Sequence, residues 1–355
     1  MKISSKLLMA ALTDIGRCTG TRTRSPITNC VHLHTSGGAL FITGDYLNQR
    51  LVRSVDCEGE IESAVVRHAW LKAAIGIDEV CKIEVSNGRI KIYNGNTKSE
   101  MSLERLDMWP QDTECEYREI GTLCKDISVG INAVKAFQHR GIDRMMMSCV
   151  HVLGGAKSLM VEATNGVCAA RWSESVISAD FDLTIPREFV DSVQEYLAIE
   201  GADIGISDHW GLISFPGGEY RFRLTNELFP TCDHIFKDSG KFISEFDIDS
   251  FLRFCQQAMS CSDESGYAVV STRYSPQGVF LKSGNAYYDI SALISGEYPE
   301  YSIKSNAAYV IQILKSFPDK KVKIYGGEFK IHYSGGNLSI HLAAMRDTPP
   351  KNQAV

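Results

Sequence analysis

The sequence lacks an apolar run long enough to cross a membrane. Apolar residues make up 44% of its 355 residues, but they are interrupted well before the roughly 18 consecutive positions that a spanning helix needs. The first residues resemble a secretory signal only superficially, because Leu8, Leu12 and Ile15 fall on one face of an amphipathic helix. We therefore expect a soluble, cytoplasmic protein with no membrane partner.

The chain also lacks the cysteine and histidine spacings of metal and disulfide sites. Its 11 cysteines are odd in number, and none forms a Cys-x-x-Cys pair, so we expect reduced and mostly buried thiols. His32 and His34 alternate on one strand, but no third ligand stands at a usable spacing. The sequence predicts no metal site.

Motifs of enzyme chemistry are missing as well. There is no Gly-x-Ser-x-Gly, His-Glu-x-x-His or dinucleotide-binding fingerprint. The segment Gly154 to Ser158 contains a Gly-Ala-Lys-Ser sequence, but the first glycine of a phosphate-binding loop is absent, so we predict a plain hairpin with a turn at Gly154-Gly155. We predict no catalytic residues, no cofactor and no enzymatic activity.

The formal net charge is −6 and the isoelectric point is about 5.9. An acidic balance counts against a surface that grips nucleic acid over its whole area. Any contact with DNA must therefore depend on a local basic surface.

A threefold internal repeat is the main positive signal. Candidate first helices begin near Ser5, Ser128 and Asp247, and candidate second helices begin near Arg67, Arg187 and Asn306, which gives a period of roughly 120 residues. Each unit of that length can bury its own core. We predict an α+β protein with three domains at 1–118, 119–238 and 239–355.

Within each unit the pattern predicts helix, strands, helix, strands. In the first unit we expect the second helix to run from Arg67 to Ile77, and Asn87-Gly88 to close a type I′ hairpin. In the second unit we expect strands from Arg144 onward. Acidic or polar connectors at 112–119 and 237–240 and a loose tail at 347–355 complete the prediction.

Several short segments, each weak alone, carry a resemblance to a known family in the same order and spacing. They are Ser25-Pro26-Ile27, Ile42-Thr43-Gly44, Ala163-Thr164-Asn165-Gly166, Thr184-Ile185-Pro186-Arg187, Leu228-Phe229-Pro230, Asn306-Ala307-Ala308-Tyr309-Val310 and Met345-Arg346. With the threefold repeat, the chain resembles the bacterial DNA polymerase III β subunit, the sliding clamp of replication, from about Leu7 to Arg346.

The resemblance implies a head-to-tail homodimer that closes into a ring around duplex DNA, with helices lining the channel. It implies as partners DNA, held without sequence preference, a DNA polymerase and a clamp loader. Basic residues on or beside the helices would contact phosphates and would explain how an acidic protein holds DNA. The candidates are Arg22, Arg24, Lys72, Lys135, Arg140, Arg187, Arg253 and Lys315. Ordinary solvated helix faces are the alternative.

The resemblance also implies a cleft that binds short partner peptides. Its candidate residues are Met147, Thr164, Gly166, Val167, Cys168, Pro230, His234, Ile235, Asn306, Tyr309, Met345 and Arg346. At the dimer interface, Met101 and Leu103 would meet Met259 and Ser260 of the second copy. As an alternative, Pro230 and Tyr309 could be plain core residues.

The sequence departs from the family's pattern in the cleft. Val167-Cys168-Ala169 stands where the family usually has His-Arg-Leu, and Ala344 replaces a proline before Met345. Such divergence suggests a clamp from a phage or mobile element, acting in its host's cytoplasm. The alternative function is a clamp-like scaffold or decoy that no longer loads on DNA.

Overall fold

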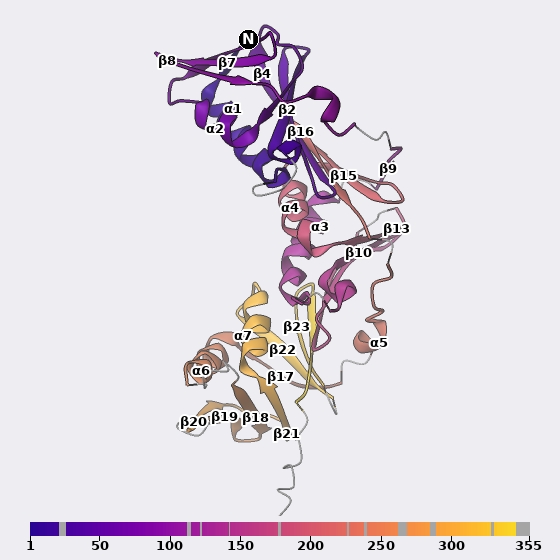
Figure 1. Ribbon diagram of the computed structural model, residues 1–355. Helices are drawn as coiled ribbons and strands as arrows, with labels where there is room; N and C mark the ends of the chain where they lie inside the picture. Colours follow the sequence, from indigo (N-terminus) through magenta and orange to yellow (C-terminus); the bar gives the residue numbers. More distant parts are fainter. Residues whose placement is uncertain are drawn as a thin grey trace, which may run out of the picture. The chain divides into compact units, whose positions relative to one another are not determined.

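The computed structural model describes residues 1–20, 26–111, 115–120, 123–141, 143–176, 179–225, 227–237, 240–261, 268–284, 289–327 and 330–345. The chain divides into two compact units (Figure 1). The first consists of Met1–Lys125 and Asp191–Asn226, and the second of Asp126–Val190 and Glu227–Val355. The divisions fall within two helices of the middle repeat. The three expected domain boundaries therefore stay a prediction.

The element order repeats three times as strand, helix, four strands, helix and three strands. The first repeat contains β1 (Lys2–Ser4), α1 (Ser5–Ile15), β2 (Cys30–Ser36), β3 (Ala39–Tyr46), β4 (Gln49–Glu58), β5 (Ala64–Arg67), α2 (His68–Ala74), β6 (Val80–Ser86), β7 (Arg89–Asn94) and β8 (Thr97–Ser102). The second contains β9 (Arg118–Glu119), α3 (Cys124–Val134), β10 (Val150–Gly155), β11 (Ser158–Thr164), β12 (Cys168–Glu174), β13 (Phe181–Ile185), α4 (Arg187–Leu197), β14 (Asp203–Ile206), β15 (Trp210–Phe215) and β16 (Gly218–Arg223).

The third repeat follows a connector that holds the short helix α5 (Asp233–Phe236). It contains β17 (Lys241–Asp247), α6 (Ile248–Ser260), β18 (Val269–Ser275), β19 (Gly278–Gly284), β20 (Asp289–Ser295), β21 (Tyr301–Asn306), α7 (Ala307–Ser316), β22 (Lys321–Gly326), β23 (Lys330–Gly335) and β24 (Leu338–Ala343). Short 3₁₀ turns include η4 (Lys135–Phe137) and η5 (Met145–Ser148). All described strand pairs are antiparallel, so the fold is α+β as predicted.

The first unit is built on one sheet of 12 strands with the order β8-β7-β6-β1-β4-β16-β15-β14-β9 and with β2, β3 and β5 branching from β4. Helix α1 packs on β3 and β4 and against α2. Its Leu8, Leu12 and Ile15 are fully buried, which confirms the amphipathic first helix. The pairing of β4 with β16 joins the first repeat to the second, and it places Leu51 opposite Tyr220 in the core.

The second unit has two sheets. One has eight strands in the order β13-β10-β11-β12-β24-β23-β22-β17, and the other has four in the order β20-β19-β18-β21. Helices α6 and α7 pack side by side, with α6 against β18, β19 and β20 (Figure 1). The pairing of β12 with β24 joins the second repeat to the third, with Ala170 opposite Ile340, both fully buried.

Local sequence signals explain most element ends. The Asp247 and Asn306 side chains accept hydrogen bonds from the backbone N–H groups of Asp249 and Ala308, so they cap α6 and α7, which begin where the sequence predicted. Asn87 and Gly88 have φ angles of 53° and 69°. Both are positive, as the type I′ hairpin between β6 and β7 requires.

Three expectations on element boundaries were wrong. The first helix of the second repeat begins at Cys124 rather than near Ser128, and α2 ends at Ala74 rather than Ile77. Helix α2 stops because Ile75 is extended, with φ −81° and ψ 117°. In place of a strand near Arg144, the chain forms the 3₁₀ turn η5.

The hairpin between β10 and β11 is present, but it turns at Ala156-Lys157 rather than at Gly154-Gly155. Gly154 lies in β10, where an added Cβ would stand 2.0 Å from a ring carbon of Phe181. This glycine therefore makes room for an aromatic ring on the neighbouring strand β13. A backbone turn was the wrong explanation for it.

All 11 cysteines are free, and eight are buried, as the sequence indicated. No helix in the described ranges is long and apolar enough to cross a membrane. Parts of both predicted connectors, and the whole tail 347–355, lie outside the described residues.

Candidate peptide cleft, helix faces and open sheet edges

The turn between β11 and β12 forms the centre of the candidate cleft. The Thr164 hydroxyl donates to the Cys168 carbonyl at 2.8 Å and accepts from the Gly166 N–H at 3.2 Å. The Asn165 side-chain oxygen accepts from the N–H groups of Val167 and Cys168 at 2.9 and 2.8 Å. Gly166 has φ +85°, a conformation that favours glycine. The turn is thus fixed by its own side chains.

The end of β24 lies against this turn. The Ala343 N–H donates to the Val167 carbonyl at 2.9 Å, and two residues later the Met345 N–H donates to the Lys304 carbonyl at 3.0 Å. Met345 is therefore held between the turn and β21. These bonds bring together candidate residues that are far apart in sequence.

Met147 completes this side of the cleft. A Cβ added at Gly166 would stand 2.8 Å from an Arg144 guanidinium nitrogen and 3.4 Å from the Met147 sulfur. The two side chains thus cover the Gly166 backbone, and Arg144 is a residue that the sequence did not identify. Val167 is 38% exposed and offers an apolar surface beside them.

An ion-pair network that is buried at Glu162 and exposed at Asp233 anchors the connector that carries Pro230, His234 and Ile235. The Arg171 guanidinium lies 2.6 Å from carboxylate oxygens of both Glu162 and Asp233, and it stacks over the Phe236 ring at 4.3 Å. Lys330 Nζ donates to the Ile235 carbonyl at 3.2 Å. The connector is therefore attached to the eight-stranded sheet by charge as well as by packing.

The floor beneath the connector is apolar. Cys149, Ala169, Phe229 and Cys232 form a buried cluster against which Ile235 and Phe236 pack. Burial raises the pKa of the Cys168 thiol to about 12, so it stays protonated. Because Cys168 is 1% exposed, its side chain belongs to the core and not to the cleft surface.

The remaining cleft candidates lie outside these contacts. Pro230 is half-buried on the connector and His234 is exposed on α5. Asn306 caps α7, and Tyr309 is half-buried one turn later. Arg346 lies outside the described residues. The structure thus brings together Met147, Thr164, Gly166, Val167 and Met345 most directly.

The helix faces carry balanced charge. The candidates Lys72, Arg187, Arg253 and Lys315 lie on α2, α4, α6 and α7, Lys135 lies in η4, and Arg140 follows it. Six bases on the long helices, Lys6, Lys72, Lys125, Arg187, Arg253 and Lys315, are matched by six acids, Asp14, Asp126, Glu188, Asp191, Glu195 and Asp249. The helices alone therefore carry no net charge, and contact of these bases with phosphates stays a prediction. Arg22 and Arg24 lie outside the described residues.

Two of the bases are already in contact with backbone oxygen. Arg187 donates to the His139 carbonyl at 3.2 Å, and Arg253 donates to the Asp249 carbonyl of its own helix at 3.4 Å. Both side chains remain exposed. Any phosphate contact here would be loose and would add little specificity.

Several strands stand at a sheet end and pair with a single described neighbour, and two of them matter for assembly. They are β8 in the first unit and β20 in the second. Of the interface candidates, Met101 on β8 and Leu103 just after it are half-buried, as is Met259 on α6. Ser260 is exposed, and its hydroxyl donates to the Gln256 carbonyl at 3.0 Å.

The histidines His32 and His34 stack on each other at 5.4 Å, and His32 Nε2 lies 2.6 Å from the Ser63 hydroxyl. Burial lowers the pKa of His32 to about 4. Among the residues with described positions there is no group of three or more His, Cys, Asp or Glu that could hold a metal ion.

No protein-family profile matches the sequence, and no curated protein sequence is significantly similar to it. Solved structures do match. The DNA polymerase III β chain of Streptococcus pneumoniae superposes with a TM-score of 0.86 and 15% identity over 97% of this chain and 99% of that one. The sliding clamp of Bacillus subtilis gives 0.87 and 16% over 98% and 99%. A Pseudomonas aeruginosa sliding clamp bound to griselimycin gives 0.88 and 15% over 98% and 99%.

Proposed function

We propose that this chain, which has the fold of bacterial β sliding clamps, is itself a sliding clamp. Two copies would close head to tail around duplex DNA in the bacterial cytoplasm, or in that of a host if the protein is phage-encoded. A clamp loader would open the ring, and a DNA polymerase would be tethered through the cleft. The role is non-catalytic, and three domains per copy follow from the repeat.

The observation that carries the proposal is a strand pairing that occurs twice within the chain. The fourth strand of the first repeat, β4, pairs with β16, the last strand of the second repeat. In the same way β12 pairs with β24. In both cases the fourth strand of one repeat pairs with the last strand of the next repeat. The fourth strand of the third repeat, β20, and the last strand of the first, β8, have no such partner within the chain, and both stand at sheet ends. A second copy would supply the missing neighbour for each, and such a head-to-tail contact between two different edges forms a ring when its rotation closes after two copies.

The second internal join gives a register for the third. The first residues of β16 and β24, Gly218 and Leu338, pair with Arg53 and Trp172. Trp172 stands three positions after Ala169, which pairs with Thr164 across its hairpin. In the third repeat Asp289 pairs with Gly284 in the same way, so the position equivalent to Trp172 is Ala292. Thr97, the first residue of β8, should therefore lie opposite Ala292 of the second copy.

This register favours a weak ring. Ser99 would lie opposite Ile290, where the internal joins have the buried pairs Leu51–Tyr220 and Ala170–Ile340. We infer that the contact between β8 and β20 of two copies separates more easily than the pairings of β4 with β16 and of β12 with β24.

The test uses a cysteine pair at the proposed register, Thr97→Cys with Ala292→Cys, treated with a short bismaleimide in the presence of plasmid. We expect covalent dimers that stay on closed circular DNA through a high-salt wash and are released when the plasmid is cut. Each single-cysteine variant is the control for reaction at native thiols such as Cys57.

The outcomes separate the alternatives. Absence of the covalent dimer in the double variant would refute the ring. Dimers that form but are lost equally from circular and linear DNA would instead identify a clamp-like scaffold or decoy that no longer encircles DNA.

A further inference from the structure

The outer face of the four-stranded sheet carries two ordered rows of side chains. In one row, Lys304 on β21, Ser271 on β18, Lys282 on β19 and Ser291 on β20 are paired in register. In the next row, Ser302, Arg273, Phe280 and Leu293 are paired in the same order. Lysines thus alternate with serines across the sheet, beside a second row that holds an arginine and two apolar residues.

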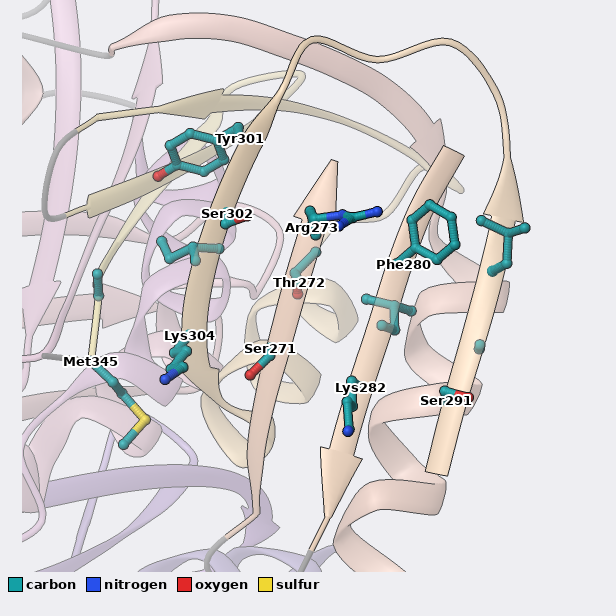
Figure 2. Close-up of a pocket in the computed structure, with 15 residues that line it drawn as sticks. Ser271, Thr272, Arg273, Phe280, Lys282, Ser291, Tyr301, Ser302, Lys304 and Met345 are labelled. Carbon is teal, nitrogen blue, oxygen red and sulfur yellow. The ribbon is translucent and has the colours of Figure 1, made fainter. Parts of the chain in front are cut away.

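These rows line a groove of about 870 Å³. Arg273 reaches over the Phe280 ring (Figure 2), with 5.0 Å between the guanidinium carbon and the ring centroid. Leu293 is 53% exposed. Three cations line the groove, and none of its described lining residues is Asp or Glu. The chain as a whole has 43 acidic and 37 basic residues, so a surface whose described charged residues are all basic differs from the average surface of this protein. It offers positive charge, hydroxyl groups and an apolar patch to the same ligand.

The groove is continuous with the candidate cleft. Ala344 and Met345 line it, and Figure 2 shows Met345 beside Lys304. The Met345 N–H is bonded to the Lys304 carbonyl, and the Ala343 N–H to the Val167 carbonyl. A peptide seated at Val167 therefore needs to pass only over the end of β24 to reach Lys304.

We propose that this face, the basic groove, binds the acidic residues that flank the apolar segment of a partner peptide. The proposal deepens the proposed function, because it assumes that the cleft beside Val167 binds peptides. Lys304 and Lys282 lie two strands apart, which is about 10 Å. A peptide in the polyproline II conformation rises about 3.1 Å per residue with three residues per turn, so residues three positions apart face the same side at about 9 Å. The favoured partner carries two carboxylates three positions apart, beyond its large apolar side chains.

The experiment measures fluorescence anisotropy of two labelled peptides with full-length protein at low salt. Both contain Leu-Ala-Leu-Phe, followed by Glu-Ser-Ser-Glu in one and by Gln-Ser-Ser-Gln in the other. We expect the acidic peptide to bind about fivefold more tightly, as two exposed ion pairs allow, and the ratio to shrink as salt is raised. The double substitution Lys282→Ser with Lys304→Ser should bring the ratio to one.

Lys323→Ser is the matched control, because Lys323 is an exposed strand lysine on the other sheet of the same unit. It should leave the ratio unchanged. Equal affinities of the two peptides for the native protein, or a ratio that survives the double substitution, would overturn the basic groove.

Two further outcomes separate the groove from the cleft. If the neutral peptide fails to bind while the acidic one binds through Lys282 and Lys304, the cleft assignment fails and the groove stands. If neither peptide binds, both fail. Tight binding of oligo-dT that depends on the same two lysines and displaces the acidic peptide would make the occupant a nucleic acid and refute the peptide assignment.

Discussion

The substitution Ser99→Val should strengthen the ring. Ser99 pairs with Ile92 within the first unit, and Ile92 is 1% exposed, so position 99 lies on the core-facing side of β8. The proposed register puts it opposite Ile290 of the second copy. At the equivalent places in the internal joins the facing residues are Leu51–Tyr220 and Ala170–Ile340. A serine here leaves a hydroxyl where the other joins bury apolar carbon.

The size of the effect follows from the chemistry of that position. Valine replaces a hydroxyl, which costs free energy when it is buried without a partner, and adds apolar area, so about 1.5 kcal/mol per join is expected. A closed dimer contains two such joins, which gives about 3 kcal/mol. That corresponds to a dimer dissociation constant roughly a hundredfold lower.

Sedimentation velocity over a dilution series measures this constant, with the dimer identified as twice 39.3 kDa. Ser102→Val is the matched control, because residue 102 is exposed on the same strand and alternates to the opposite face. An unchanged dissociation constant for the Ser99 variant, or the same change in both variants, would show that β8 does not pair in this register.

The other predictions concern stability. Replacing Arg171 with Ala should lower the free energy of unfolding by about 3 kcal/mol, because Glu162, 3% exposed, would keep a buried charge that is offset only by the longer contact with His151 at 3.8 Å. Thermal unfolding measures this, and a loss below about 1 kcal/mol would contradict the anchoring role. Burial, and secondarily the charge of Lys330, lowers the pKa of His332 to about 4, so its contribution is present above pH ~6.5 and is lost as the pH falls toward 4. Denaturant titrations should show stability falling by about 1–3 kcal/mol over that window, with a smaller slope in His332→Phe and a residual slope from His32. Identical slopes would contradict this.

The fold could be predicted from sequence to the extent that its signals are local. Asp247 and Asn306 are helix caps, and Asn87-Gly88 is a hairpin turn, so each specifies its element within a few residues. Because the same order of elements occurs three times, signals in one repeat also supported the elements predicted in the other two. The predicted element boundaries were wrong where a contact between residues far apart in sequence determines the structure. At Gly154 that contact is with the Phe181 ring on another strand.

The cleft was predictable only in part, for the same reason. The turn at Gly166 has a local sequence signature, but Arg171 becomes a site residue only through Glu162 on the neighbouring strand and Asp233 far along the chain. No spacing in the sequence reveals that register. The basic groove is another case, because Lys282 and Lys304 meet Ser271 only once three strands are aligned.

The even balance of acids and bases on the helices has a consequence for motion along DNA. If these helices face a threaded duplex, the phosphates attract the bases and repel the acids to a similar extent. When the protein moves along the DNA by one phosphate, the total electrostatic energy therefore changes little. Friction from charge would then be low in either direction. How long the protein stays on a closed circle would depend on how often a join between the two copies comes apart, and hardly on the strength with which the helices attract the phosphates.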